Sequence, residues 1–209
     1  MNACLLFEQS GTFKRAFIEQ EHTAIDIDYK DHYGQTDLKI DIFDSIEQGT
    51  IEFINDYDII IAFFPCTWFS KQNDLIYSRK LPCFRKWDNE KADHYLENRY
   101  RDFNRAKTVL LQLIEICKKP LIIENPASRR IVDILGFPEY YIKDRSKHGD
   151  ILRKPTYLYT YNGVKISDLD IIPTKRGKDV NHISTLKRSE ISPIFAKNLV
   201  SHIILDGLY

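Results

Sequence analysis

Short apolar runs that suit buried strands alternate along the chain with stretches of helical spacing. The clearest run is Asp58-Ile-Ile-Ile-Ala-Phe-Phe64, which Pro65 ends. An unbroken apolar run of this kind is typical of a central parallel strand that is buried on both faces. The alternation predicts an α/β fold, a mostly parallel sheet with helices on both faces. Further strands are expected over 3–7, 24–28, 38–42 and 120–124.

The predicted helices follow these strands and are recognised by apolar residues three and four positions apart. The longest covers 89–118, and Ser128 is placed to cap a short helix over 129–135. Residues 68–88 show no clear periodicity and are expected to be irregular. The remaining helices are predicted from Gly11 to Gln20, over 45–55 and over 192–205.

The pattern changes after Gly136, where two runs look like antiparallel strands, over 140–142 and 156–161. Residues 162–190 are polar and rich in turn-forming residues. We expect one domain over 1–209, with 137–190 as a small C-terminal subregion. The chain length of 209 residues fits one domain.

Charge and cysteine content narrow the function classes. Thirty basic residues balance thirty acidic ones, so no global field favours nucleic acid, although a local basic groove is compatible with this balance. No CxxC pair or zinc-ligand spacing is present, so no metal site is expected. Cys4 and Cys117 lie in apolar runs and are interpreted as small buried residues. No apolar run is long enough to span a membrane and no signal peptide is recognisable, so a cytoplasmic location is expected.

Candidate chemistry gathers where predicted strands end, which is where doubly wound sheets bind their ligands. Phe7-Glu-Gln-Ser-Gly11 follows the first strand, and Gly11 allows a tight turn close to a ligand. Asp28 and Asp41 close the next two short strands. A carboxylate in such a position commonly binds the ribose of an adenosine cofactor.

Two proline-containing turns carry the strongest signal. Phe64-Pro65-Cys66-Thr67 ends one strand, and Glu124-Asn125-Pro126 ends another. A thiolate is a good nucleophile, and a neighbouring carboxyl group can bond a ring nitrogen of a substrate. The structural alternative is a packed thiol at Cys66 and a helix-capping Glu124.

Taken together, these residues resemble the DNA cytosine-5 methyltransferases, most closely the short methyltransferase-like proteins of bacteriophages and prophages. The Pro-Cys and Glu-Asn-Pro turns carry the resemblance in this order. Supporting matches are Glu8, Ser10, Gly11, Ala16, Phe17, Asp58, Ile61, Ala62, Phe69, Ser70, the stretch 154–158, Arg188 and Ser189.

The resemblance implies a Rossmann-like, S-adenosylmethionine-dependent methyltransferase fold and a covalent mechanism. Cys66 would add to carbon 6 of cytosine while Glu124, in the motif with Asn125, bonds ring nitrogen 3. Arg153 or Lys154 is the expected basic residue that steadies the base. The implied cofactor pocket consists of Phe7, Glu8, Ser10, Gly11, Thr12, Asp28, Asp41, Phe64 and Pro65. DNA is the expected partner, and a base within a duplex would have to be flipped out.

The chain departs from the family pattern at several points. Gln9 replaces a glycine of the cofactor loop, where a side chain could crowd the methionine part of the cofactor. Phe64 replaces the first proline of Pro-Pro-Cys, and Pro126 replaces the usual valine. Only about thirty polar residues, 162–190, stand where a target-recognition domain is usual.

These departures leave other functions open. One is a methyltransferase that acts on RNA or free nucleotides, and another is a catalytically weak or inactive relative that binds cofactor, nucleic acid or a host protein. The presence of both Cys66 and Glu124 favours an enzyme. A nicotinamide dehydrogenase is disfavoured because Gly-x-Gly-x-x-Gly is missing, and a zinc deaminase because Pro-Cys-x-x-Cys is missing.

Overall fold

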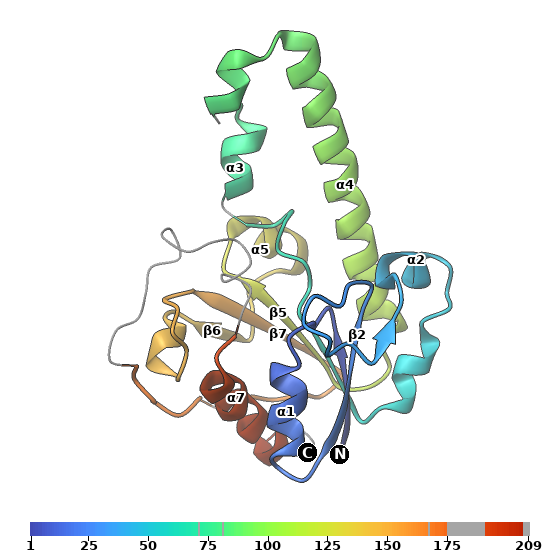
Figure 1. The fold of residues 1–209 in the computed structure, drawn as a ribbon, viewed down its shortest axis with the longest axis vertical. Coiled ribbons are helices and arrows are strands. Elements are labelled where there is room, and N and C mark those ends of the chain that lie inside the picture. Colours follow the sequence, from blue (N-terminus) through green and yellow to red (C-terminus); the bar gives the residue numbers. More distant parts are fainter. Residues whose placement is uncertain (71, 81, 167, 175–190, 207–209) are drawn as a thin grey trace.

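The structure is a computed structural model that describes residues 1–70, 72–80, 82–166, 168–174 and 191–206. Its centre is a seven-stranded sheet in the order β3-β2-β1-β4-β5-β7-β6 (Figure 1). The strands are β1 (Asn2–Leu6), β2 (Thr23–Asp28), β3 (Leu38–Lys39), β4 (Ile59–Ala62), β5 (Leu121–Pro126), β6 (Tyr140–Ile142) and β7 (Thr156–Tyr161).

Five strands run parallel, and β7 runs antiparallel to both of its neighbours. The strand order reverses at β1, which pairs with β2 on one side and β4 on the other. Such a switch point opens a crevice at the carboxyl ends of the strands. The predicted Rossmann-like α/β fold, a mostly parallel sheet with helices on both faces, is confirmed, and so are the two antiparallel strands near the C-terminus.

Helices cover both faces of this sheet (Figure 1). On one face α1 (Thr12–Ile18) and α7 (Pro193–Asp206) pack on Leu5 and Ile61. On the other face α2 (Ile42–Glu47), α4 (Asn89–Ile116) and α5 (Arg129–Leu135) form a second core with the alternate strand residues. Cys4 and Cys117 belong to that second core and are buried, as expected. None of the described helices combines the length and the apolar character that a bilayer span requires.

Several element boundaries are confirmed and one predicted helix is wrong. The cap at Ser128 is present, since its hydroxyl accepts a hydrogen bond from the Ile131 amide at 3.4 Å. The helix expected over 45–55 is instead α2, which begins earlier, and a separate 3₁₀ turn, Glu52–Asp56. Gly49 separates the two with a φ of 69°, a left-handed conformation that ends a helix.

The segment expected to be irregular, 68–88, is partly helical. It contains α3 (Gln72–Tyr77) and a 3₁₀ turn, Pro82–Lys86. Together with the first half of α4 they extend beyond the sheet (Figure 1), and we refer to residues 72–105 as the arm. The arm has a small core of its own, built by Phe84, Ala92, Leu96 and the partly buried Ile76, Tyr77, Cys83, Trp87 and Tyr95. Amphipathic spacing could not reveal such short elements, because each of them is only one or two turns long.

Candidate active site at the carboxyl ends of the strands

Cys66 lies in a tight turn directly after the buried strand β4. Its carbonyl oxygen accepts hydrogen bonds from the amides of Phe69 at 3.1 Å and Ser70 at 3.0 Å. The side chain is half-buried at the carboxyl edge of the sheet. The backbone therefore holds the thiol at the crevice that the fold creates.

Two side chains from the neighbouring strand end fix this turn. Asn125 Nδ2 donates to the Phe64 carbonyl at 2.9 Å, and Ser128 Oγ donates to the Phe69 carbonyl at 2.5 Å. Asn125 is fully buried. The side chain predicted to be catalytic at position 125 thus holds the backbone on the amino side of the thiol. Ser128 therefore has two roles, since it caps α5 and also holds the backbone on the carboxyl side of the thiol.

Glu124 ends up beside Cys66 because β4 and β5 are adjacent and parallel, with Ala62 opposite Ile123. The carboxyl group is buried, and its Oε1 lies 3.5 Å from Arg145 Nη1. Among the described residues, this oxygen has no hydrogen-bond partner. A buried acceptor without a partner is costly, so the site is suited to a ligand that donates a hydrogen bond there.

Burial and two nearby charged groups set the protonation state of the Cys66 thiol. Burial raises its pKa most strongly, the nearby Lys154 ammonium lowers the pKa, and the Glu124 carboxylate raises it. The net effect is a pKa above the ordinary thiol value, so the resting thiol is protonated at neutral pH. Of the two predicted basic residues, Lys154 thus lies within electrostatic reach of the thiol, whereas the Arg153 side chain is exposed.

Arg145, which no sequence pattern pointed to, is fully buried and lies next to Glu124. Its Nε donates to Asp150 Oδ2 at 2.6 Å, and its guanidinium carbon lies 4.7 Å from the centre of the Phe195 ring. A single arginine in a polar turn normally indicates a solvent-exposed side chain. Only the paired acid five residues later, Asp150, could have suggested burial.

The predicted cofactor loop after β1 is held together by Glu8. Its Oε2 accepts from the Gly11 amide at 2.7 Å, and its Oε1 accepts from Ser10 Oγ at 2.5 Å. Ser10 Oγ is also bonded to Thr12 Oγ1 at 2.7 Å. Gly11 has a φ of 66°, and a Cβ there would come within 3.0 Å of Gln35 Oε1. The loop therefore requires glycine, as the sequence predicted for a tight turn.

Asp28 and Asp41, the two predicted adenosine-binding acids, differ in their surroundings. Asp28 is buried at the end of β2, accepts from the Lys30 amide at 2.8 Å and bonds the Gln9 side chain. Burial raises the pKa of this carboxyl group. Asp41 is exposed and caps α2 by accepting from the Asp44 amide at 3.2 Å. Gln9 thus interacts with the predicted ribose-binding acid, and the crowding of the methionine part of a cofactor by Gln9 stays a prediction.

Phe64 belongs to an aromatic cluster that borders the predicted pocket. Its ring centroid lies 5.2 Å from that of Phe7 and 5.6 Å from that of Phe43. Trp68 lies 5.5 Å from Phe43 and packs against the core. The aromatic side chain at position 64 fills the space beside Phe7, and Pro65 after it is half-buried.

Comparison with known proteins gives likenesses to solved structures but no match in sequence. No protein-family description and no curated protein matched the sequence. The chain is similar to a crystal structure described as a DNA modification methyltransferase encoded within a prophage of E. coli, with 14% identity and a TM-score of 0.45. The match covers 84% of this chain and 51% of the other, so this chain spans about half the length of that protein.

Proposed function

We propose that this chain is an S-adenosylmethionine-dependent methyltransferase that acts on carbon 5 of cytosine, with DNA as its substrate. The observation that carries the proposal is the juxtaposition of Cys66 and Glu124 at the ends of adjacent parallel strands. At the switch-point crevice the thiol can attack a ring carbon of a bound base while the neighbouring carboxyl group binds a ring nitrogen of the same base.

The loop after β1 and the end of β2 fit an adenosyl cofactor. Glu8, Ser10, Gly11 and Thr12 shape the loop, and Asp28 offers a buried carboxylate for ribose hydroxyls. Asp41 would face the adenine while it caps α2. Gln9 must release Asp28 before a ribose can bind there. When bound, S-adenosylmethionine supplies an electrophilic methyl group.

In the proposed reaction the Cys66 sulfur forms a bond to carbon 6 of the cytosine ring. Glu124 gives a proton to nitrogen 3 as the electron pair of the 5,6 double bond shifts to the 4,5 bond, and the resulting enamine makes carbon 5 nucleophilic. After carbon 5 is methylated, it loses its proton, the double bond re-forms and the sulfur–carbon bond breaks. Lys154 assists at the start by favouring the thiolate.

The test is expression in a host without cytosine methylation, with modified nucleosides in DNA and RNA measured by mass spectrometry. Wild type and Cys66→Ala are compared with Cys83→Ala, a matched control because Cys83 is another half-buried thiol, within the arm. We expect 5-methylcytosine in DNA with wild type and Cys83→Ala and none with Cys66→Ala. Equal methylation with Cys66→Ala would refute the covalent mechanism, and methylation of RNA alone would reassign the substrate.

The contact between Gln9 and Asp28 favours a second candidate, a protein that binds cofactor or a macromolecule without turnover. Calorimetric titration with S-adenosylhomocysteine distinguishes the two. Gln9→Gly removes the contact and should tighten binding. Tight binding by wild type without any methylated product would support the second candidate.

A further inference from the structure

The arm projects beyond the edge of the sheet at which β5 leads into α5 (Figure 1). Cys66 follows β4, which runs parallel to β5, so the thiol lies at the same edge. The arm follows the nucleophile turn directly in the sequence, and Arg99 Nη2 in α4 donates to the Thr67 carbonyl at 3.2 Å. The rings of Phe69 and Phe103 lie 5.7 Å apart. The base of the arm and the nucleophile turn are thus packed together, and anything bound along the arm lies next to the candidate site.

One limb of the arm is strongly basic, although the whole chain has no net charge. Residues 75–87 include four cations and no carboxylate. All four of these side chains, Arg79, Lys80, Arg85 and Lys86, belong to exposed residues. The first carboxylate after them, Asp88, accepts from the Lys91 amide as the cap of α4. Residues 75–87 therefore carry a net charge of +4. Among the described residues one of these cations is paired, Arg79 with Asp93 in the adjoining start of α4, where Asp88, Glu90 and Glu97 also lie.

Aromatic side chains line the base of the arm below this basic limb. The rings of Tyr77 and Tyr100 lie 4.6 Å apart, and the Arg130 guanidinium carbon lies 4.3 Å from the centre of the Tyr77 ring. Tyr100 is 47% exposed. Cationic grooves combined with aromatic and arginine faces are typical of single-strand nucleic-acid binding, in which bases stack on the rings.

We propose that the arm is the nucleic-acid-binding surface of this protein. The cations of residues 75–87 bind backbone phosphates, and Tyr100 stacks on a base next to the one that enters the Cys66 site. This inference rests on the proposed function for the identity of the target base.

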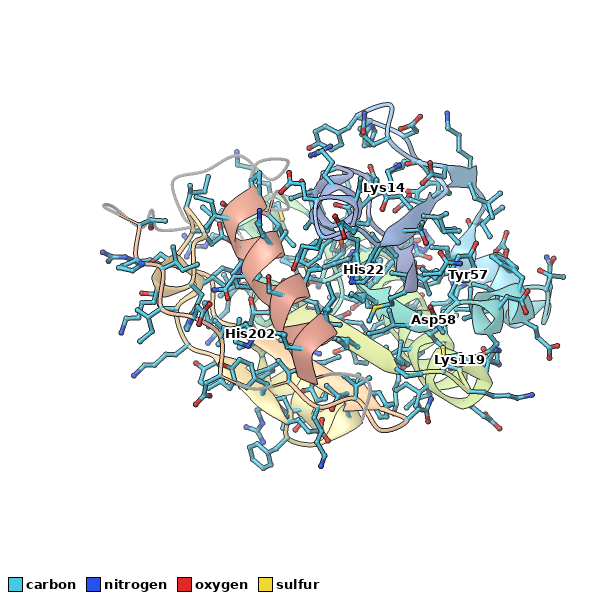
Figure 2. The ribbon with its side chains drawn as sticks, turned by 90° about the horizontal axis from the view of Figure 1, so that it is seen from below. Lys14, His22, Tyr57, Asp58, Lys119 and His202 are labelled. Atoms are coloured by element: carbon cyan, nitrogen blue, oxygen red, sulfur yellow. The ribbon has the colours of Figure 1, made fainter. Side chains whose placement is uncertain are left out.

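Binding is measured by fluorescence anisotropy with a labelled 20-nucleotide single strand and the matching duplex, over a range of salt concentrations. The arm double variant carries both Arg85→Glu and Lys86→Glu. The control double variant carries both Lys118→Glu and Lys119→Glu, which change the net charge by the same amount at the opposite end of the molecule, where Figure 2 shows Lys119. Tyr100→Ala tests stacking. Circular dichroism and unfolding midpoints check that each variant is folded.

We expect the arm double variant to weaken binding by at least about tenfold. The slope of the logarithm of the binding constant against the logarithm of the salt concentration should become shallower by about 1.4, because each phosphate contact to a single strand contributes about 0.7 to that slope. Tyr100→Ala should weaken single-strand binding about tenfold. The proposal is overturned if wild type binds neither probe, or if the two double variants bind equally. Cys66→Ala should bind as wild type does, so a failure of catalysis and a failure of the arm give different results.

Discussion

Replacing Arg145 by methionine tests whether a buried guanidinium organises the candidate site. The side chains of Arg145 and Asp150 are both 0% exposed, and Nη1 lies 3.5 Å from the Glu124 carboxylate, which is 8% exposed. Removing one partner of such a buried pair costs about 3–5 kcal/mol, because a charge is left in a low-dielectric region without compensation. Contact with the Phe195 ring adds about 0.5–2 kcal/mol to the loss. We therefore expect Arg145→Met to lower the free energy of unfolding by about 3.5–7 kcal/mol.

Urea unfolding followed by circular dichroism measures this change. Arg101→Met is the control, since its side chain is 75% exposed and its removal should change the free energy by about 0.5 kcal/mol or less. Combining Arg145→Met with Asp150→Asn removes both charges and keeps an acceptor for the Leu152 amide, which Asp150 binds at 3.1 Å. The double variant should recover a large part of the loss. If Arg145→Met stayed within about 1 kcal/mol of wild type, the assignment of a buried ionic cluster beneath Glu124 would be wrong.

Three further predictions concern thiol reactivity, pH dependence and backbone strain. Because burial raises the pKa of Cys66, alkylation of this thiol by iodoacetamide, measured by mass spectrometry, should be slow at pH 7 and accelerate above pH 9. Lys154→Met should slow the alkylation further, since Lys154 lowers the pKa of the thiol. An alkylation rate that Lys154→Met leaves unchanged would contradict this electrostatic role. Burial raises the pKa of Asp26 to about 8, so the native state binds this proton more tightly than the unfolded chain does. Stability should therefore fall as the pH rises from about 4 to about 8, and Asp26→Asn should remove that slope; an unchanged slope would refute the assignment. Gly149→Ala should lower the free energy of unfolding by at least about 2 kcal/mol, because the φ of residue 149 is 98° and the new Cβ would lie 2.5 Å from Ile194 Cγ2. Thermal or urea unfolding measures this change, and an unchanged free energy of unfolding would contradict the packing of Gly149 against Ile194.

Apolar pattern was enough to predict the central part of the fold. The strands β4 and β5 are runs of residues buried on both faces, and α4 carries apolar residues at helical spacing over 103–114. Both patterns are regular enough to be recognised in the sequence. The pairing of Cys66 with Glu124 followed from the rule that parallel strands end at one edge. Their approach in the structure agrees with that inference, while their chemistry stays a proposal.

The features that the sequence did not predict depend on contacts between segments that are distant along the chain, or on very short helices and turns. The burial of Arg145 arises because Phe195 of α7 and the end of β5 close over it, and neither is near it in the sequence. α2 ends early because of one left-handed glycine at position 49. Most of the polar segment 162–190, that is residues 167 and 175–190, lies outside the described residues. Residues 72–88 of the arm, which were expected to be irregular, contribute to a core of their own.

The two consecutive residues Glu124 and Asn125 serve the site in different ways because side chains alternate along a strand. Asn125 points to the face of the sheet where Phe64 packs, and its amide holds the Phe64 carbonyl. Glu124 points to the opposite face, where Arg145 lies between it and α7. One residue therefore fixes the position of the nucleophile turn, and the other supplies a charge whose environment Arg145 controls. A change at Asn125 should act through geometry, and a change at Glu124 through electrostatics, so the two should differ in how their effects depend on pH.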